Sequence, residues 1–486
     1  MVEREGIDPH LFVVLGATGD LMQRKLLPAL FHVSADEMLR DKVALLGAAR
    51  RDLGDAGFRE LLHGALTASG VDPTDQRRSW ADSMVHYQRL DPEHGASFGD
   101  LKRAVESAEA AHGLPGNRIF YLALPLDAVP AVVSGLGDAG LATSPGWVRL
   151  VVEKPFGVDL ASAQALNAHL HRRFQESDLY RIDHYLGKET VQNLLVFRFA
   201  NTLFESAWNR DRVEAVEITV AEDLGVEDRA GYYETAGALR DMVQNHLTQV
   251  LTLVAMDVPA VLTADAVRNE KVKVLQAVKP VLPADVVLGQ YGRGQVDGRE
   301  VAAYREEPGV AKDSRTETFA ALKLSIGSWR WEGVPFLVRT GKRLPSKSTR
   351  IVVSFRRPPV AFFASTDSLP MRPNTLTITV QPDEGFELSF EIKVPGHDLK
   401  MQSHRMHFRY SEAFGPLADG YQTLLTDLMR GDQTLFVRAD EVEAAWRLYD
   451  DLLTKKPAPF PYPAGSEGPV QAESLAESVG YRWSAR

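Results

Sequence analysis

Nine residues from Arg181 to Glu189 bring cations, carboxylates, an imidazole and a phenol together in one short stretch: Arg-Ile-Asp-His-Tyr-Leu-Gly-Lys-Glu. On a helical turn, His184 and Lys188 would share a face because they are four residues apart. A shared cationic face suits a dianion such as a phosphate ester, and Asp183 is then available to orient a base. A charged stretch of this kind is also typical of a solvated helix end, so its neighbours must decide between the two interpretations.

A glycine turn near the N-terminus is the second candidate site. The apolar run 11–15 is typical of a buried strand, and helical periodicity begins at Leu21. A glycine turn between a strand and a helix can bring the backbone close to a pyrophosphate at the helix N-terminus. The Gly-x-x-Gly spacing is shorter than the full dinucleotide motif and is a weak signal by itself. The candidate cofactor residues are Gly16, Ala17, Thr18, Gly19, Asp20 and Leu21.

The end of the second expected strand bears on the choice of nucleotide. Residues 43–49 read as a strand and are followed by Arg50 and Arg51. In a Rossmann-type domain this strand end meets the adenosine ribose, where an acid accepts the 2′-hydroxyl of NAD and an arginine pairs with the 2′-phosphate of NADP. Arg50 therefore favours NADP, whereas Arg51 is equally well explained as a solvent-facing residue.

The elements that position these residues alternate between strand and helix through residue 180. Further strands are expected near 84–87, 119–125 and 148–152, and helices near 58–68, 97–111, 127–136 and 161–174. Alternation at this length predicts a doubly wound, mostly parallel Rossmann-type domain over residues 1–180. Lys154 then lies at the carboxyl end of a strand, where such sheets bind ligands, and its bond to Pro155 is a candidate cis peptide.

The pattern from residue 181 to residue 486 predicts a larger domain of a different class. Residues 213–220 alternate like a half-buried strand that leads to Glu222, and 235–255 read as one long helix. Asp241 and His246 on that helix are expected to project in different directions. Strands near 318–326, 336–339, 349–355, 374–380 and 386–394 predict a mainly antiparallel sheet flanked by helices, with 290–299 read as loops and final helices near 421–429 and 441–453.

Composition narrows the class of protein. A chain of 486 residues is long enough for two domains, and its net charge of −10 argues against a nucleic-acid partner. There are no cysteines, and hence no thiolate metal site, and there is no apolar run of membrane-spanning length and no secretion leader, so we expect a cytoplasmic enzyme. We also expect a small-molecule substrate and no metal. An acidic protein must gather cations locally to bind phosphate; the candidates are Lys154, Arg181, His184, Lys188, Lys342, Arg343 and Lys347.

Three blocks in order give the chain a resemblance to a known family. They are Glu153-Lys154-Pro155-Phe156-Gly157, the nine residues from Arg181, and Arg240-Asp241-Met242-Val243-Gln244-Asn245-His246. Together they closely resemble the glucose-6-phosphate dehydrogenase family, and the resemblance covers nearly the whole chain. It implies oxidation of glucose 6-phosphate at C1 to 6-phosphoglucono-1,5-lactone with NADP, the first step of the pentose phosphate pathway. Because a sheet with an exposed face usually needs a partner, we also expect a homodimer or homotetramer.

The resemblance also implies residue roles. His246 would be the catalytic base and Asp183 would orient it. The residues implied to bind substrate are Lys154, His184, Tyr185, Lys188, Glu222, Asp241, Lys342, Lys347 and Gln381, with Lys154 also touching the nicotinamide. The sequence departs from the family at Leu126, where a second proline is usual, and at Glu467, where tryptophan is usual. Too few matching basic residues are present to carry over the second, structural NADP site of some members.

Two alternatives are kept. Another sugar dehydrogenase with a nucleotide-binding domain and a large sheet would not need the His-x-x-x-Lys grip, and would use unphosphorylated glucose with similar efficiency. A non-catalytic paralogue that binds ligand as a sensor or scaffold would have lost the base or its partner, and both His246 and Asp183 are present. The NADP:NAD preference ratio and the choice between dimer and tetramer stay open.

Overall fold

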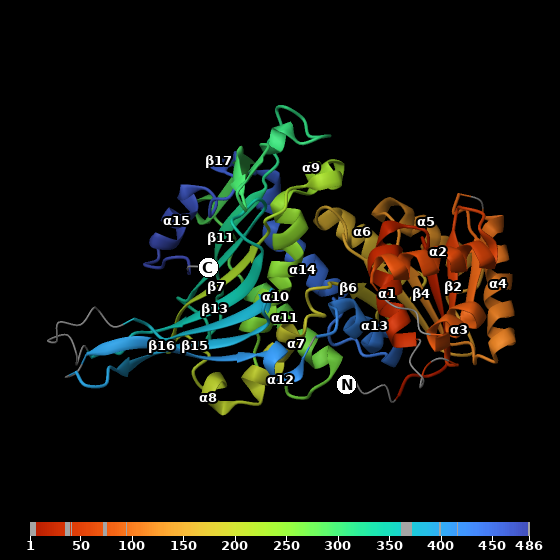
Figure 1. The fold of residues 1–486 in the computed structure, drawn as a ribbon, viewed down its shortest axis with the longest axis horizontal. Coiled ribbons are helices and arrows are strands. Elements are labelled where there is room, and N and C mark those ends of the chain that lie inside the picture. The colour runs from red at the N-terminus through yellow and green to blue at the C-terminus, as the bar shows by residue number, and fades with distance from the viewer. Residues whose placement is uncertain are drawn as a thin grey trace. The chain divides into compact units, whose positions relative to one another are not determined.

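The structure is a computed structural model that describes residues 6–34, 39, 41–70, 75–93, 95–360, 372–397, 400–415 and 417–484. The chain forms two compact units, each built on one large sheet (Figure 1). Unit 1 comprises Met1–Gly187, Val261–Arg268 and Ala418–Glu443. Unit 2 comprises Lys188–Ala260, Asn269–Leu417 and Ala444–Arg486.

Unit 1 contains a six-stranded parallel sheet in the order β3-β2-β1-β4-β5-β6. This is the strand order of a doubly wound dinucleotide-binding fold, so the predicted fold class of this part is confirmed. Strand β6 was not predicted. The strands are β1 (His10–Leu15), β2 (Val43–Ala49), β3 (Val85–Arg89), β4 (Arg118–Leu122), β5 (Val148–Glu153) and β6 (Leu179–Ile182).

Helices follow the strands of unit 1 as the alternating pattern predicts. Every residue of β1, β2 and β4 is buried, which is typical of parallel strands covered on both faces. Helix α13 comes from much later in the chain and packs against α1 (Figure 1). The helical segments are η1 (Met22–Leu26), α1 (Leu27–Ser34), α2 (Gly54–Ala68), α3 (Asp75–Met84), α4 (Ala96–His112), η2 (Leu126–Ala128), α5 (Val129–Asp138), α6 (Leu160–His171), η3 (Glu176–Asp178) and α13 (Gly420–Arg430).

Unit 2 contains a nine-stranded sheet in the order β16-β15-β14-β13-β7-β12-β11-β8-β17. All its pairs are antiparallel except β7–β12 and β8–β17, so the predicted mainly antiparallel sheet is confirmed. The strands are β7 (Val213–Ala221), β8 (Val286–Gly292), β11 (Phe319–Ser325), β12 (Pro335–Gly341), β13 (Ser348–Phe355), β14 (Thr375–Gln381), β15 (Gly385–Lys393), β16 (Met401–Arg409) and β17 (Phe460–Pro463).

Two strand predictions for unit 2 are wrong. Residues 290–299, expected as loops, lie largely in β8 and in a small hairpin of β9 (Gly294–Val296) and β10 (Arg299–Val301). Strand β7 is not half-buried: eight of its nine residues are buried, including Glu217 and Thr219. The reason is its central position, because β12 and β13 pair with it on either side and its polar residues form hydrogen bonds in the interior.

The long helix expected over 235–255 is three segments. Gly237 breaks it with a φ of +62°, and a π-helix, η5 (Leu239–Leu247), separates α9 (Ala230–Ala238) from α10 (Thr248–Ala255). The remaining helices are α7 (Glu189–Phe199), α8 (Thr202–Glu205), η4 (Glu227–Arg229), α11 (Ala264–Ala277), η6 (Pro283–Asp285), η7 (Tyr304–Glu306), α12 (Tyr410–Phe414), α14 (Ala439–Thr454) and α15 (Val470–Glu477). Among the described helices, none has both the length and the apolar composition needed to cross a membrane.

Candidate active site

The glycine turn of unit 1 follows β1 directly, next to β4. Gly16 has a φ of +93°, and a Cβ added there would lie 2.2 Å from the carbonyl oxygen of Ala123 after β4. The turn closes with a hydrogen bond of 3.0 Å from the Gly19 N–H to the Gly16 carbonyl. Between β1 and β4 the strand order reverses, which is where doubly wound sheets bind ligands. Asp20, at the end of the turn, forms an exposed ion pair with Arg24 at 2.7 Å.

Arg50 is exposed at the carboxyl end of β2. The turn that carries it is fixed from β3, because the Tyr87 hydroxyl donates to the carbonyl of Arg51 at 2.6 Å and to that of Ala49 at 3.3 Å. The backbone on both sides of Arg50 is therefore held while its guanidinium faces solvent. This arrangement suits a cation that meets a charged group on a bound nucleotide.

Lys154 follows β5 at the carboxyl edge of the parallel sheet, as predicted, and the Lys154–Pro155 peptide bond is cis. The residue before it, Glu153, receives hydrogen bonds from the hydroxyls of Tyr121 and Tyr421. Burial raises the pKa of Glu153 from its ordinary 4.5 to about 7, against the opposing effect of the two tyrosines and Lys154. A carboxyl group that titrates near neutrality therefore lies beside the predicted ligand-binding lysine.

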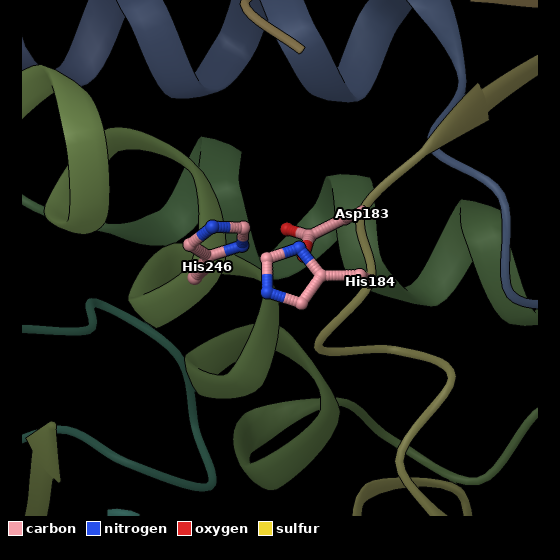
Figure 2. Close-up of side chains that lie close together, drawn as sticks. All are labelled: Asp183, His184 and His246. Atoms are coloured by element: carbon pink, nitrogen blue, oxygen red, sulfur yellow. The ribbon is translucent and has the colours of Figure 1, made fainter. Parts of the chain in front are cut away.

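Asp183, His184 and Tyr185 lie in a turn after β6, and no helix begins there. The Asp183 carboxylate accepts the Tyr185 N–H at 3.0 Å, and a carboxylate oxygen of Asp183 lies within 4.8 Å of a ring nitrogen of His184. Figure 2 shows both side chains projecting to the same side of this turn. Asp183 is 2 % exposed and Tyr185 7 %, whereas His184 is half-buried.

Lys188 is the residue that precedes α7, and its backbone is extended. The helical turn that would have put it on one face with His184 is therefore not formed. Arg181, included among the candidate phosphate-binding cations, is fully buried instead: it pairs with Glu176 at 2.6 Å and with Asn167 at 3.0 Å. Its charge is used inside unit 1, and the prediction for this residue is wrong.

Four predicted substrate residues of unit 2 lie where four neighbouring strands of the nine-stranded sheet end or begin, on the same side of the sheet's strands. The pairing aligns Ala221 of β7 with Gly341 of β12 and with Ser348 of β13, and Thr349 with Gln381 of β14. Glu222 follows β7, Lys342 follows β12, Lys347 precedes β13 and Gln381 is the last residue of β14, so the four lie at neighbouring strand ends.

Contacts at this edge differ from residue to residue. The Lys342 ammonium pairs with the Glu222 carboxylate at 2.6 Å. Gln381 donates to the Thr349 hydroxyl at 2.9 Å, and Lys347 is exposed. Arg343, the neighbouring candidate cation, lies 3.4 Å from both Glu227 and Glu307, so two carboxylates already balance its charge.

Asp241 and His246 are both buried on η5 (Figure 2 shows His246). The Tyr232 hydroxyl donates to Asp241 at 3.2 Å, and the ring of Tyr233 lies 5.2 Å from the Lys342 ammonium. In a π-helix the hydrogen bonds join residues five apart, which brings positions 241 and 246 toward one side. The expectation that they project in different directions assumed an α-helix and is not supported by this geometry.

Sequence reasoning missed the tyrosines that surround the predicted residues. Tyr121 and Tyr421 hold Glu153, and Tyr232 holds Asp241. Burial and the neighbouring carboxylates raise the pKa of each of these hydroxyls, so they act as hydrogen-bond donors at neutral pH. Tyr232 could have been found from its place in Gly231-Tyr232-Tyr233-Glu234, but Tyr421 lies more than 250 residues from its partner and has no local signal.

Comparison with known proteins relates nearly the whole chain to one enzyme family. Two family models match it: the glucose-6-phosphate dehydrogenase NAD binding domain over residues 13–193 and the glucose-6-phosphate dehydrogenase C-terminal domain over residues 195–484. The chain is 44% identical over 490 residues to the glucose-6-phosphate 1-dehydrogenase of Treponema pallidum (strain Nichols), covering 98% of this chain and 95% of that protein. It is 40% identical over 484 residues to the same enzyme of Bacillus subtilis (strain 168), covering 97% and 98%.

A solved structure agrees with these sequence relationships. It is described as a glucose-6-phosphate dehydrogenase in complex with its substrate glucose-6-phosphate, and it superposes with a TM-score of 0.91 at 36% identity over 99% of both chains. A second, the glucose-6-phosphate 1-dehydrogenase from Mycobacterium avium, gives a TM-score of 0.87 at 33% identity, also over 99% of both chains. From its two family models, its full-length relatives and its fold, the chain belongs to the glucose-6-phosphate 1-dehydrogenase family.

Proposed function

We propose that this enzyme oxidises D-glucose 6-phosphate at C1 to 6-phosphoglucono-1,5-lactone with NADP, as the first step of the pentose phosphate pathway. The observation that carries the proposal is the full-length relationship to glucose-6-phosphate 1-dehydrogenases at 40–44% identity. Residues 1–180 would bind the nucleotide, and residues 181–486 would bind the sugar phosphate and form the subunit interface. The chain would work in the cytoplasm.

The local geometry fits a dinucleotide. Gly16 lies so close to the Ala123 carbonyl that any side chain at this position would clash, which keeps the turn after β1 narrow. Backbone amides at such a turn suit a pyrophosphate, and exposed Arg50 supports a 2′-phosphate, hence NADP over NAD. When bound, the nicotinamide would accept the hydride from C1.

The proposed base is His246, with Asp183 as the residue that orients it. Oxidation of the C1 hydroxyl requires loss of its proton as hydride leaves C1, and histidine is suited to this task near neutral pH. Asp183 would fix the imidazole tautomer and stabilise the imidazolium that forms. Both side chains are buried, so the proton transfer would take place out of bulk water.

Substrate binding would use two groups of residues. His184, Tyr185, Lys188 and Lys342 would bind the 6-phosphate, with Lys347 alongside, because ionic hydrogen bonds to a dianion are strong. Lys154, Glu222, Asp241 and Gln381 would bind the sugar hydroxyls. Lys342 pairs with Glu222 at 2.6 Å, so the two groups of residues would meet at this ion pair. Remote phosphate binding would hold C1 in a reactive position.

The test is an absorbance assay at the reduced-nicotinamide band with glucose 6-phosphate or glucose, each paired with NADP or NAD. We expect rapid reduction with glucose 6-phosphate and NADP. Equal efficiency on unphosphorylated glucose would instead favour the alternative sugar dehydrogenase. No reduction with either sugar would favour the ligand-binding paralogue.

The enzyme would be a homodimer or homotetramer. Strands β15 and β16 expose apolar side chains at one end of the nine-stranded sheet: Ile392, Met406 and Phe408, with Phe414 next to them on α12. An exposed apolar sheet surface of this kind is typical of a subunit interface. Light scattering of the wild type and of Met406→Asp tests this. A wild-type mass of one chain would contradict it.

A further inference from the structure

Glu153 joins two segments of unit 1 that are far apart in the sequence. It is the last residue of β5, and its Oε1 accepts the hydroxyl of Tyr121 from the neighbouring strand β4. The same oxygen accepts the hydroxyl of Tyr421, the second residue of α13, at 3.3 Å. The carboxylate therefore ties α13 to the carboxyl edge of the parallel sheet.

Tyr421 in turn lies against the proposed phosphate-binding turn. Its ring is parallel to the imidazole of His184 within 6°, with the ring centroids 6.2 Å apart. The backbones are also close: a Cβ added at Gly187 would lie 2.3 Å from the carbonyl oxygen of Gly420. The Asp419 carboxylate fixes the start of α13 by accepting the Tyr421 N–H at 2.9 Å. With the helix start fixed, the hydroxyl contact with Glu153 sets how the Tyr421 ring faces His184.

The charges around this contact make it sensitive to the state of Glu153. Burial raises the pKa of Glu153, whereas Tyr121 on β4, Tyr421 on α13 and Lys154 lower it. Burial and Glu153 raise the pKa of Tyr421, and Asp419 and Asp183 raise it further. Ionised, Glu153 accepts hydrogen bonds from both tyrosine hydroxyls. Protonated, it becomes a donor itself, and its hold on Tyr421 weakens.

We propose that Glu153 is a positioning residue that, through the hydroxyl of Tyr421, fixes the imidazole of His184 for binding the substrate phosphate. This inference rests on the proposed function, because His184 is assigned to the 6-phosphate there. Glu153 would not touch the substrate. It would act by limiting the arrangements open to the turn after β6, so that less binding energy is lost in ordering it.

The kinetic test compares Glu153→Gln, Tyr421→Phe and the double variant. Each single change should raise KM for glucose 6-phosphate about tenfold, the scale of one hydrogen bond to a charged group, and change kcat less than about twofold. Because both act through one contact, the double variant should be no worse than the more impaired single variant. An unchanged KM in either single variant, or multiplied effects in the double variant, would overturn the proposal. If Glu153→Gln does not fold, Tyr421→Phe decides by the same criterion.

Tyr304→Phe is the matched control. The Tyr304 hydroxyl also donates to a carboxylate, at 2.6 Å to Glu234, whose same oxygen accepts the Ser314 hydroxyl at 2.7 Å. This pair is in unit 2 and contacts none of the proposed site residues through these bonds. The control should lower thermal stability as a lost tyrosine hydroxyl does and leave KM unchanged.

A second readout does not depend on turnover. In enzyme with ¹³C-labelled histidine, the His184 imidazole signal, assigned by its loss in His184→Asn, should shift in Glu153→Gln and in Tyr421→Phe but not in Tyr304→Phe. If the wild type does not oxidise glucose 6-phosphate, the proposed function fails while this measurement still decides whether Glu153 positions His184. A His184 signal that is the same in all three variants and the wild type would refute the positioning role.

Discussion

Replacing Glu153 with glutamine should change the stability of the enzyme in a way that depends on pH. The folded state raises the pKa of this carboxyl from 4.5 to about 7, so the folded protein keeps a proton that the unfolded chain releases between these values. The contribution of Glu153 to the free energy of unfolding therefore falls as pH rises through this window and is constant above it. This rise of about 2.5 in the pKa of Glu153 corresponds to a loss of about 3 kcal/mol in the free energy of unfolding.

Glutamine cannot ionise, so Glu153→Gln should escape this loss. The free energy of unfolding of the variant minus that of the wild type should be about 3 kcal/mol larger at pH 8 than at pH 4.5. Any constant cost of a weaker bond to Tyr121 and Tyr421 cancels in that comparison, as do the other titrating groups. Urea unfolding followed by tryptophan fluorescence at both pH values measures it.

A stability difference between Glu153→Gln and wild type that is the same at pH 4.5 and pH 8 would refute the reasoning. Tyr421→Phe gives an independent check of the sign. The Tyr421 hydroxyl lowers the pKa of Glu153, so removing the hydroxyl should raise that pKa further and extend the loss of stability to higher pH. A shift of the window to lower pH in Tyr421→Phe would contradict the assigned cause.

Four further predictions concern the site and its support. His246→Asn should lower kcat about 10²- to 10⁴-fold with near-normal binding of glucose 6-phosphate, measured by steady-state kinetics and titration; an unchanged kcat would exclude it as the base. Arg50→Ala should raise KM for NADP at least about tenfold and leave KM for NAD nearly unchanged; equal increases would exclude a 2′-phosphate contact. Lys342→Met should raise KM for glucose 6-phosphate about tenfold to a hundredfold, and a normal KM would remove it from the phosphate site. Glu217→Gln should destabilise unit 2 by about 3–5 kcal/mol, because the buried Arg339 would lose its buried carboxylate and keep only the exposed Glu467 at 3.8 Å; urea unfolding that matches wild type would show that Glu467 compensates the charge.

Much of the fold could be predicted because local signals were strong. The buried runs of β1, β2 and β4 and the glycine turn after β1 fixed the doubly wound class. Strand β16 was missed because its polar residues, with mostly exposed side chains, carry no apolar alternation. The π-helix η5 was missed because periodicity alone predicts only an α-helix over the same apolar positions.

The candidate site was predictable in its residue types and less so in its contacts. Lys154 follows its strand as expected, and Glu222 and Lys342 share one sheet edge. The sequence alone did not show which charged side chains pair with one another. Arg181 is neutralised inside the fold by Glu176, although its neighbours in the sequence suggested phosphate binding. Such pairings depend on tertiary contacts, to which a cation's sequence neighbours are a poor guide.

Unit 1 draws its last segment, Ala418–Glu443, from the far end of the chain. During synthesis, β1 to β6 leave the ribosome long before α13 exists, so the sheet must wait for more than 230 further residues before Tyr421 can reach Glu153. Contacts of such sequence separation are slow to form, and surface that they will cover is exposed in the meantime. We therefore expect a fragment that ends at Gly187 to be an incomplete domain and prone to aggregation, because unit 1 is complete only when the chain has been made as far as Glu443.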